Sequence, residues 1–155
     1  MYCPNCGIET DSGGQFCGSC GANLQTGEVV FGDLLPRVGF ADAIKLGFNN
    51  YFTFSGRSRR SEYWFWALFT FLGGAVFQVV DGITGVAIFY SIFSLVIIIP
   101  GLALGARRLH DIGKSGWWQL LWVAVLVGWV ILIIWNIRDS DEAPNSHGPN
   151  PKYSS

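Results

Sequence analysis

Three long runs without a charged residue constrain this chain more than any other feature. They extend from Tyr63 to Val80, from Gly82 to Ala106 and from Ser115 to Ile137. A helix needs roughly 20 apolar residues to cross the hydrocarbon core of a bilayer. A soluble protein of 155 residues has too little interior to bury three such segments on every side. We therefore expect three transmembrane helices, over about residues 63–80, 86–106 and 117–137, rather than core helices of a soluble domain.

The composition divides the chain into four parts. We expect a Cys- and Gly-rich module over residues 1–25, a linker over 26–39, a membrane domain over 40–139 and a polar tail without regular structure over 140–155. The membrane domain opens with an apolar stripe at helical spacing, formed by Phe40, Ile44, Phe48, Tyr51 and Phe52. This stripe predicts an amphipathic helix in the membrane interface or against the bundle, although surface helices of soluble domains show the same pattern.

Basic residues predict how the spans are oriented. Lys and Arg concentrate in short loops on the cytoplasmic side. Basic residues precede the first predicted span and follow the second, whereas the turn "DGITG" between them has none. Three spans would then leave the N-terminus in the cytoplasm and the tail outside. The N-terminus lacks a basic region followed by an apolar run, so we expect no cleavable signal peptide. Asp81 is expected to cap the outer turn at the membrane interface, since a buried carboxylate there would be costly and would indicate a functional site.

The N-terminal module contains the chain's four cysteines, in "CPNCG" and "CGSCG". Each Cys-x-x-Cys pair can turn two sulfurs toward one ion, so Cys3, Cys6, Cys17 and Cys20 predict a closed, structural tetrahedral Zn²⁺ site in a small zinc ribbon. A module this small depends on metal binding to fold. Three alternatives are iron in a rubredoxin-like site, two disulfides, which need an oxidising compartment, and a redox pair, which needs a βαβ setting.

Charge also indicates what the module binds. Residues 1–36 contain no Lys or Arg, and they include Glu9, Asp11, Glu28 and Asp33. Nucleic-acid binding depends on cations that contact phosphates. We therefore expect no nucleic-acid partner, and we expect the module to meet a cytosolic protein or the membrane face of its own chain.

Three motifs in the membrane domain carry a family resemblance: "FSGRSRRSEYW" before the first span, "ARRLHDIGKSGWW" between the later spans, and "GPNP" near the end. With them, residues 40–151 resemble the DUF805 family of bacterial inner-membrane proteins. His147 stands where an aromatic residue usually precedes Gly-Pro in that family. Residues 1–25 resemble the zinc-ribbon domains fused to many bacterial membrane proteins. The resemblance implies a plasma-membrane location and supplies no reaction.

The two basic motifs are the candidate site within the membrane domain. They contribute six cations: Arg57, Arg59, Arg60, Arg107, Arg108 and Lys114. Arg107, Arg108, His110 and Asp111 come at the C-terminal end of the second predicted helix, where cations interact favourably with the negative helix end and with anionic lipid headgroups. A sharper hypothesis is one site for an anion or a lipid headgroup, with Glu62 and Asp111 as internal partners, since Arg forks suit phosphate. His110 beside Asp111 without a placed nucleophile is no triad, and we expect no enzymatic activity.

Two functions remain compatible with these features. The first is a non-enzymatic interaction or regulatory protein whose zinc ribbon recruits a cytosolic partner. The second is a small transporter or lipid-handling subunit. Because the predicted spans contain few polar side chains, the second function would require a homo-oligomer.

Overall fold

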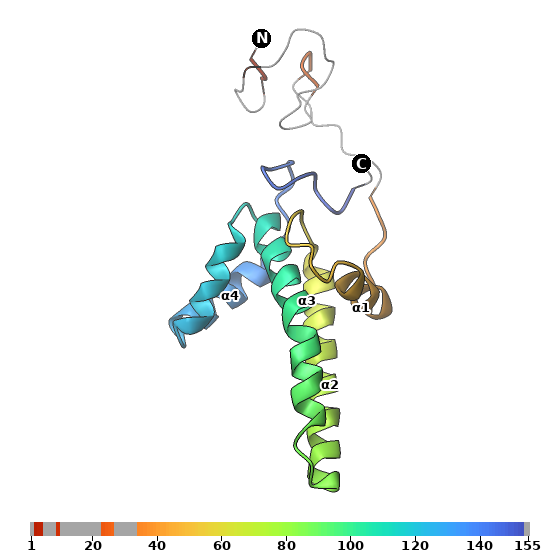
Figure 1. Cartoon of the computed structure of the whole chain (residues 1–155). Coiled ribbons are helices and arrows are strands. Elements are labelled where there is room, and N and C mark those ends of the chain that lie inside the picture. Colours follow the sequence, from red (N-terminus) through yellow and green to blue (C-terminus); the bar gives the residue numbers. More distant parts are fainter. Residues whose placement is uncertain (1, 5–8, 10–22, 27–33, 154–155) are drawn as a thin grey trace.

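The computed structural model describes residues 2–4, 9, 23–26 and 34–153, and the regular secondary structure of these residues is helical apart from isolated β-bridges (Figure 1). The helices are α1 (Phe40–Asn49), α2 (Arg60–Thr84), α3 (Phe89–Asp111), the 3₁₀ helix η1 (Gly116–Val123) and α4 (Val127–Ile137). Helices α2 and α3 form a long hairpin. We call the end where α2 begins and α3 ends the basic end.

The α2–α3 hairpin places two continuous helices over the first two predicted spans. Both helices are long and apolar enough to cross a membrane, with 25 and 23 residues and mean hydropathies of 1.5 and 2.1. At the turn, Gly85 adopts a left-handed conformation with φ +70°, which suits glycine because it lacks a Cβ. The carboxylate of Asp81 accepts hydrogen bonds from the backbone N–H groups of Phe89 and Tyr90, both at 3.0 Å. The expected cap is therefore present, at the start of α3.

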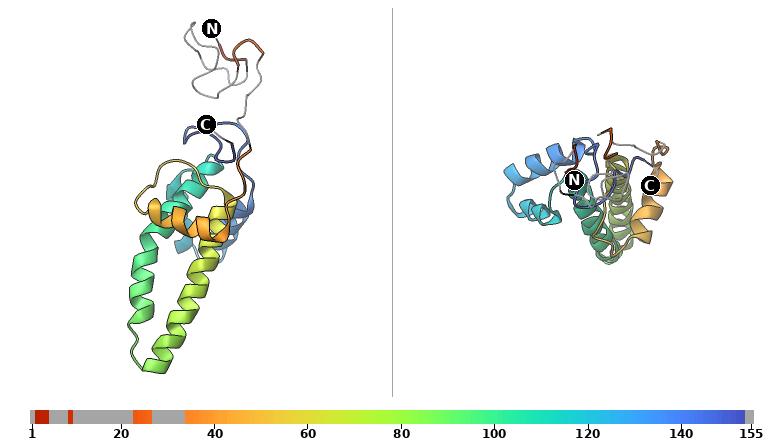
Figure 2. Two further views of the ribbon diagram at one scale, coloured as in Figure 1. Left: turned by 90° about the vertical axis from the view of Figure 1, so that its right-hand side faces the viewer. Right: turned by 90° about the horizontal axis from the view of Figure 1, so that it is seen from above.

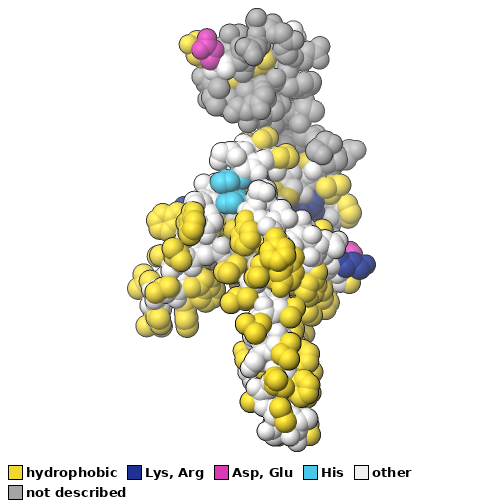
Figure 3. Space-filling model, viewed as in Figure 1, with side chains coloured by type: hydrophobic (Ala, Val, Ile, Leu, Met, Phe, Trp, Pro, Cys, Tyr) yellow, Lys and Arg dark blue, Asp and Glu magenta, His cyan; other side chains and the backbone are white. Residues whose placement is uncertain are grey.

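The outer surface of this hairpin is apolar. Its exposed side chains include Phe71, Ile83 and Leu95, which expose 72%, 80% and 70% of their surface. Figure 3 shows hydrophobic side chains along the whole length of the hairpin. Apolar surface on this scale is stable only when another apolar phase covers it, and a bilayer supplies one. Length, composition and exposure together fit a helical membrane protein.

The predicted third span, residues 117–137, is not one helix. The chain folds η1 and α4 into a short arm beside α3, with a break at Ala124–Leu126, where Leu126 has φ +69° (Figures 1 and 2). Trp129 Nε1 donates to the carbonyl of Trp122 across this break, at 3.0 Å. The 11 residues of α4 rise only about 16 Å, well short of a bilayer core of about 30 Å. The prediction of one continuous helix over this run was wrong. The turn is made of apolar residues, so the sequence has no polar or charged residue that would mark the interruption.

This arm returns the chain to the basic end. The tail after α4 lies there in Figures 1 and 2, against the loop before α2. The amide of Asp141 donates to the carbonyl of Asp111 at the end of α3, at 3.2 Å. The expectation that the tail and the basic loops lie on opposite sides therefore fails in this structure. Its physical reason is that the third apolar run reverses instead of crossing.

Helix α1 confirms the predicted amphipathic segment, and it lies crosswise on the hairpin near the basic end (Figure 2). The ring of Phe48 packs edge-to-face on Trp66 of α2, with centroids 5.2 Å apart. Just beyond α1, the hydroxyl of Tyr51 donates to the carbonyl of Val96 on α3, at 2.7 Å. Asp42 and Lys45 lie on the exposed side of α1. The apolar face therefore binds both long helices and fixes the segment that leads into α2.

Close contact between α1 and α2 depends on Gly47, because a Cβ there would overlap the indole ring of Trp66. We predict that Gly47→Ala destabilises the protein by about 1–3 kcal/mol, the usual cost of overpacking. Gly82→Ala is the matched control, since a Cβ at Gly82 in α2 meets nothing within 4 Å and alanine favours helix. Thermal unfolding in detergent measures both variants, and equal melting temperatures would contradict the prediction.

Candidate functional site

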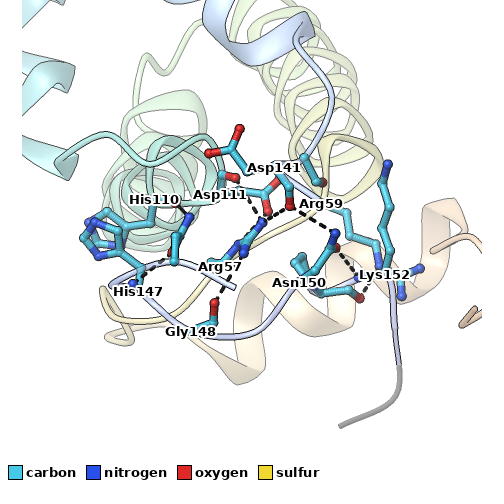
Figure 4. Close-up of polar contacts among 12 residues, drawn as sticks. Arg57, Arg59, His110, Asp111, Asp141, His147, Gly148, Asn150 and Lys152 are labelled. Carbon is cyan, nitrogen blue, oxygen red and sulfur yellow. Dashed lines mark hydrogen bonds and ion pairs between the residues drawn. The ribbon is translucent and has the colours of Figure 1, made fainter. Parts of the chain in front are cut away.

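A buried ionic triad of Arg57, Asp111 and Arg108 forms the centre of the basic end (Figure 4 shows Arg57 and Asp111). Arg57 Nε lies 3.0 Å from Asp111 Oδ1, and Arg108 Nη1 lies 2.7 Å from Asp111 Oδ2. The three side chains are at most 1% exposed. One carboxylate thus pairs with two guanidinium groups, and the triad retains a positive charge that must be met by other oxygen atoms.

Local structure explains why these residues meet. Arg108 and Asp111 stand in the last turn of α3, at the i and i+3 positions that face each other on a helix. The positive charge of Arg108 also interacts favourably with the negative, C-terminal end of the α3 dipole. Arg57 comes from the loop between α1 and α2, and the amide of Ser58 donates to the carbonyl of Arg107, at 3.1 Å. This backbone bond fixes the loop beside α3 and so directs Arg57 toward Asp111.

Arg57 also binds the tail through backbone carbonyls. Nη2 donates to Asp141 O at 2.7 Å, and Nη1 donates to Ala143 O at 3.0 Å and to Gly148 O at 3.3 Å. Asn150 supports the same loop, since its Nδ2 donates to the carbonyls of Asp141 and Glu142 (Figure 4). The carbonyl dipoles of the tail therefore compensate the positive charge of the triad that Asp111 does not neutralise. The tail is thus part of the site.

Arg108 fixes the end of α4 in the same way. Its guanidinium donates to the carbonyls of Asn136 and Arg138. The indole Nε1 of Trp64 on α2 donates to the same Asn136 carbonyl, at 3.2 Å. The triad and Trp64 thus connect α2, α3, α4 and the tail at one point. Their hydrogen bonds to the end of α4 hold the short arm against the hairpin.

Arg59 forms a second junction, between the tail and the linker. Its Nε donates to Pro151 O at 2.6 Å, and its Nη1 donates to Pro36 O at 2.7 Å. Beside it, the amide of Leu35 donates to the carbonyl of Lys152, at 2.8 Å. Arg59 is only 7% exposed, so these contacts occupy a largely buried guanidinium. The described end of the linker is therefore bound to the membrane domain at the basic end.

The other predicted cations lie apart from the triad. Arg107 is buried, with the opposite charge of Glu62 nearby. Lys114 Nζ lies 4.3 Å from the ring centroid of Trp135, a cation–π contact. Arg60 is half-exposed, and its Nε lies 3.9 Å from Asp139 Oδ1. The structure thus brings Arg57 and Arg108 together on Asp111 and does not collect all six cations on one surface. Their predicted role in anion binding stays a prediction.

Asp139 and Lys152 meet on the outside of the basic end. Lys152 Nζ donates to Asp139 Oδ1 at 2.5 Å, and this hydrogen bond lowers the pKa of the carboxyl below its ordinary value. The carboxylate is therefore ionised throughout the physiological range. Its side chain is 53% exposed, so solvent screening keeps the pair weak.

The imidazole rings of His110 and His147 stack on each other, with centroids 3.8 Å apart and planes 2° apart. His110 Nδ1 hydrogen-bonds the carbonyl of Gly56 at 3.2 Å, and Asn145 Nδ2 donates to His110 O at 2.9 Å. His147 thus uses its ring as an aromatic surface that packs the tail on the end of α3. Figure 4 shows the pair beside Arg57.

The cysteines leave the zinc prediction open. Cys3 is described and buried, but Cys6, Cys17 and Cys20 lie outside the described residues. Among the described residues, no group of three or more His, Cys, Asp or Glu side chains could hold a metal ion. The predicted Zn²⁺ site therefore remains a prediction from the spacing of the four thiols.

Comparison with known proteins agrees with this architecture. The family model described as "Protein of unknown function (DUF805)" matches residues 51–149. The chain belongs to the DUF805 family. It is 38% identical to the Inner membrane protein YhaI of Escherichia coli K12 over 108 residues, which cover 68% of this chain and 92% of YhaI. It is 37% identical to the Inner membrane protein YhaH of the same strain over 109 residues, covering 66% and 90%. No solved structure matches the chain.

The DUF805 match includes every residue of the triad and the tail positions that Arg57 binds. Side-chain chemistry predicted Asp111 as an internal partner, whereas the backbone carbonyls of the tail were missed. The available signal was "GPNP": Gly148 and Pro151 supply acceptors to Arg57 and Arg59, and Asn150 ties the loop. Gly148 has φ +129°, a conformation that L side chains rarely adopt.

The triad predicts a strongly position-dependent effect of losing a carboxylate. Asp111→Asn keeps the shape but leaves two buried guanidinium groups without a counter-charge, so we expect a loss of about 3–5 kcal/mol in the free energy of unfolding. Asp139→Asn removes an exposed carboxylate and should cost less than about 1 kcal/mol. Denaturation of both variants in detergent measures the difference, and a similar loss in the two would show that the triad does not stabilise the fold.

Proposed function

We propose that this DUF805 protein is a non-enzymatic protein of the bacterial inner membrane that presents an N-terminal zinc ribbon to a cytosolic protein partner. The observation that carries the proposal is the position of Arg59. Its guanidinium binds the carbonyl of Pro36 in the linker and that of Pro151 in the tail. A module that precedes this linker is therefore tethered to the basic end of the membrane domain.

Charge and kinship support the cytoplasmic placement of that end. Arg and Lys side chains gather where α2 begins and α3 ends, and such loops stay in the cytoplasm. YhaI and YhaH are both named as inner membrane proteins. Because the tail is bound at the same end, the C-terminus in this proposal is cytoplasmic as well.

Reporter fusions to the complete chain test this placement. Green fluorescent protein joined after Ser155 should fluoresce, and alkaline phosphatase at the same position should be inactive, since the former matures in the cytoplasm and the latter in the periplasm. Alkaline phosphatase inserted between Thr84 and Gly85, in the α2–α3 turn, is the control and should be active. An active phosphatase after Ser155 would contradict the cytoplasmic placement of the tail.

The metal content tests the module. Four thiolates close one tetrahedral site, so the full-length protein should contain about one zinc per chain. Cys17→Ser should lose the metal, and Ser19→Ala, within the same "CGSC" turn, should retain it. Elemental analysis of the purified protein measures both variants. Retained iron in place of zinc, or no bound metal in the intact protein, would overturn the zinc ribbon.

A cavity favours the second candidate function, an oligomeric transporter or lipid-handling subunit. About 350 Å³ of space lies between α2, α3 and the arm, with polar side chains on its walls that include Tyr63, Thr70, Gln119 and Asn136. Crosslinking in native membranes separates the two functions. A cytosolic protein captured through residues 1–25 would support the recruiting role, whereas a homo-oligomer without that partner would support the second candidate.

A further inference from the structure

A cationic pocket lies beside the triad, between the linker, the start of α2 and the tail. Its volume is about 480 Å³. Among the described residues, four cationic side chains and one carboxylate line it: Arg37, Arg59, Arg60, Lys152 and Asp139. The cationic side chains thus exceed the carboxylates by three, and such an excess in a concave site attracts an anion.

Three of these cations have little internal compensation. In the described part of the chain, Arg37 makes no ion pair and no side-chain hydrogen bond. Arg60 has only the 3.9 Å contact with Asp139, and Lys152 shares the same carboxylate. Arg59 donates to the carbonyls of Pro151 and Pro36, as the triad guanidinium groups donate to other carbonyls, so the open charge of the pocket comes from the other three cations. The pocket therefore contrasts with the triad, whose guanidinium groups already donate hydrogen bonds to acceptors within the protein.

The apolar part of the wall indicates what kind of anion fits. Leu34, Leu35, Trp64 and Phe65 line the pocket together with the cations. From Arg60, one exposed strip of α2 continues away from the basic end through Trp64, Leu68 and Leu72. These residues are four apart, so each is the neighbour of the next on a ridge that winds gradually around the helix, and Leu72 is about 18 Å from Arg60 along the axis.

In a bilayer leaflet the headgroups lie outermost, and the acyl chains lie below them; Trp side chains of membrane proteins concentrate at the level between the two. The cations of the pocket, Trp64 and the leucines of the strip follow one another in this order. We infer that this pocket binds an anionic phospholipid of the cytoplasmic leaflet, with its phosphate among Arg37, Arg60 and Lys152 and an acyl chain along the α2 strip. A free phosphate would use the cations alone, whereas the continuous apolar strip at the pocket's edge favours the lipid. The site is independent of the zinc ribbon and depends on the cytoplasmic placement of the basic end, which the reporter fusions check separately.

Native mass spectrometry of the full-length protein in a neutral detergent tests the inference, with phosphatidylglycerol, phosphatidylcholine or inorganic phosphate added. Arg37→Gln/Arg60→Gln should weaken phosphatidylglycerol retention about 30-fold, since each juxtamembrane cation contributes roughly fivefold to anionic-lipid binding. Lys45→Gln is the matched control, because Lys45 is an exposed cation on α1 outside the pocket, and it should bind as the parent protein does. Arg37→Gln alone removes a side chain that makes no ion pair with the rest of the described chain, so it gives a readout even if the double variant is unstable.

Several results would overturn the lipid site. One is retention of phosphatidylglycerol by the double and single variants at the parent level. Another is equal retention of zwitterionic phosphatidylcholine, which would show that charge is not used. Displacement of phosphatidylglycerol by inorganic phosphate at comparable concentration would identify a free anion as the ligand instead. Preferential retention of phosphatidylglycerol that resists phosphate and falls only in the pocket variants would establish the site.

Discussion

The ion pairs of Asp111 with Arg57 and Arg108 are the interaction on which the arrangement of this membrane domain depends. A carboxylate with no exposed surface is costly unless it is paired, and here it is paired twice. The excess positive charge is met by carbonyls at the end of α4 and in the tail. Segments that are more than 80 residues apart in the sequence are thereby joined. The buried charges thus select one arrangement of the arm and the tail rather than simply adding stability.

This interaction also determines what remains available for binding. Arg57 and Arg108 are enclosed by protein oxygen atoms, to which their guanidinium groups already donate hydrogen bonds. The cations around Arg37 and Arg60 are different, because one carboxylate serves several of them. A single basic end therefore contains two kinds of site, a structural junction and an open cationic pocket.

Much of the fold could be predicted because lipid-facing helices leave a plain signal. The long uncharged runs predicted the helices α2 and α3, and the helical spacing of apolar residues predicted α1. The position of Asp81 in the outer turn predicted its role as a cap. The reversal between η1 and α4 had no such signal. It is built from apolar residues, and Gly128 permits it because a Cβ there would overlap the carbonyl of Leu121. The tail left only the "GPNP" motif as a signal, since its carbonyls are acceptors that every residue type possesses.

The most direct test of the central claim is hydrogen–deuterium exchange of the full-length protein in detergent, followed in the peptides that cover residues 139–153. Their amides include those of Asp141, Gly148 and Tyr153, which are hydrogen-bonded in the folded tail. We predict slow exchange there in the parent protein and fast exchange in Arg57→Lys, which keeps the charge but lacks the guanidinium fork. Exchange in α2 and α3 away from the basic end should not change. Fast exchange of the parent tail, or equal protection in Arg57→Lys, would contradict the role of Arg57 as the residue that holds the tail.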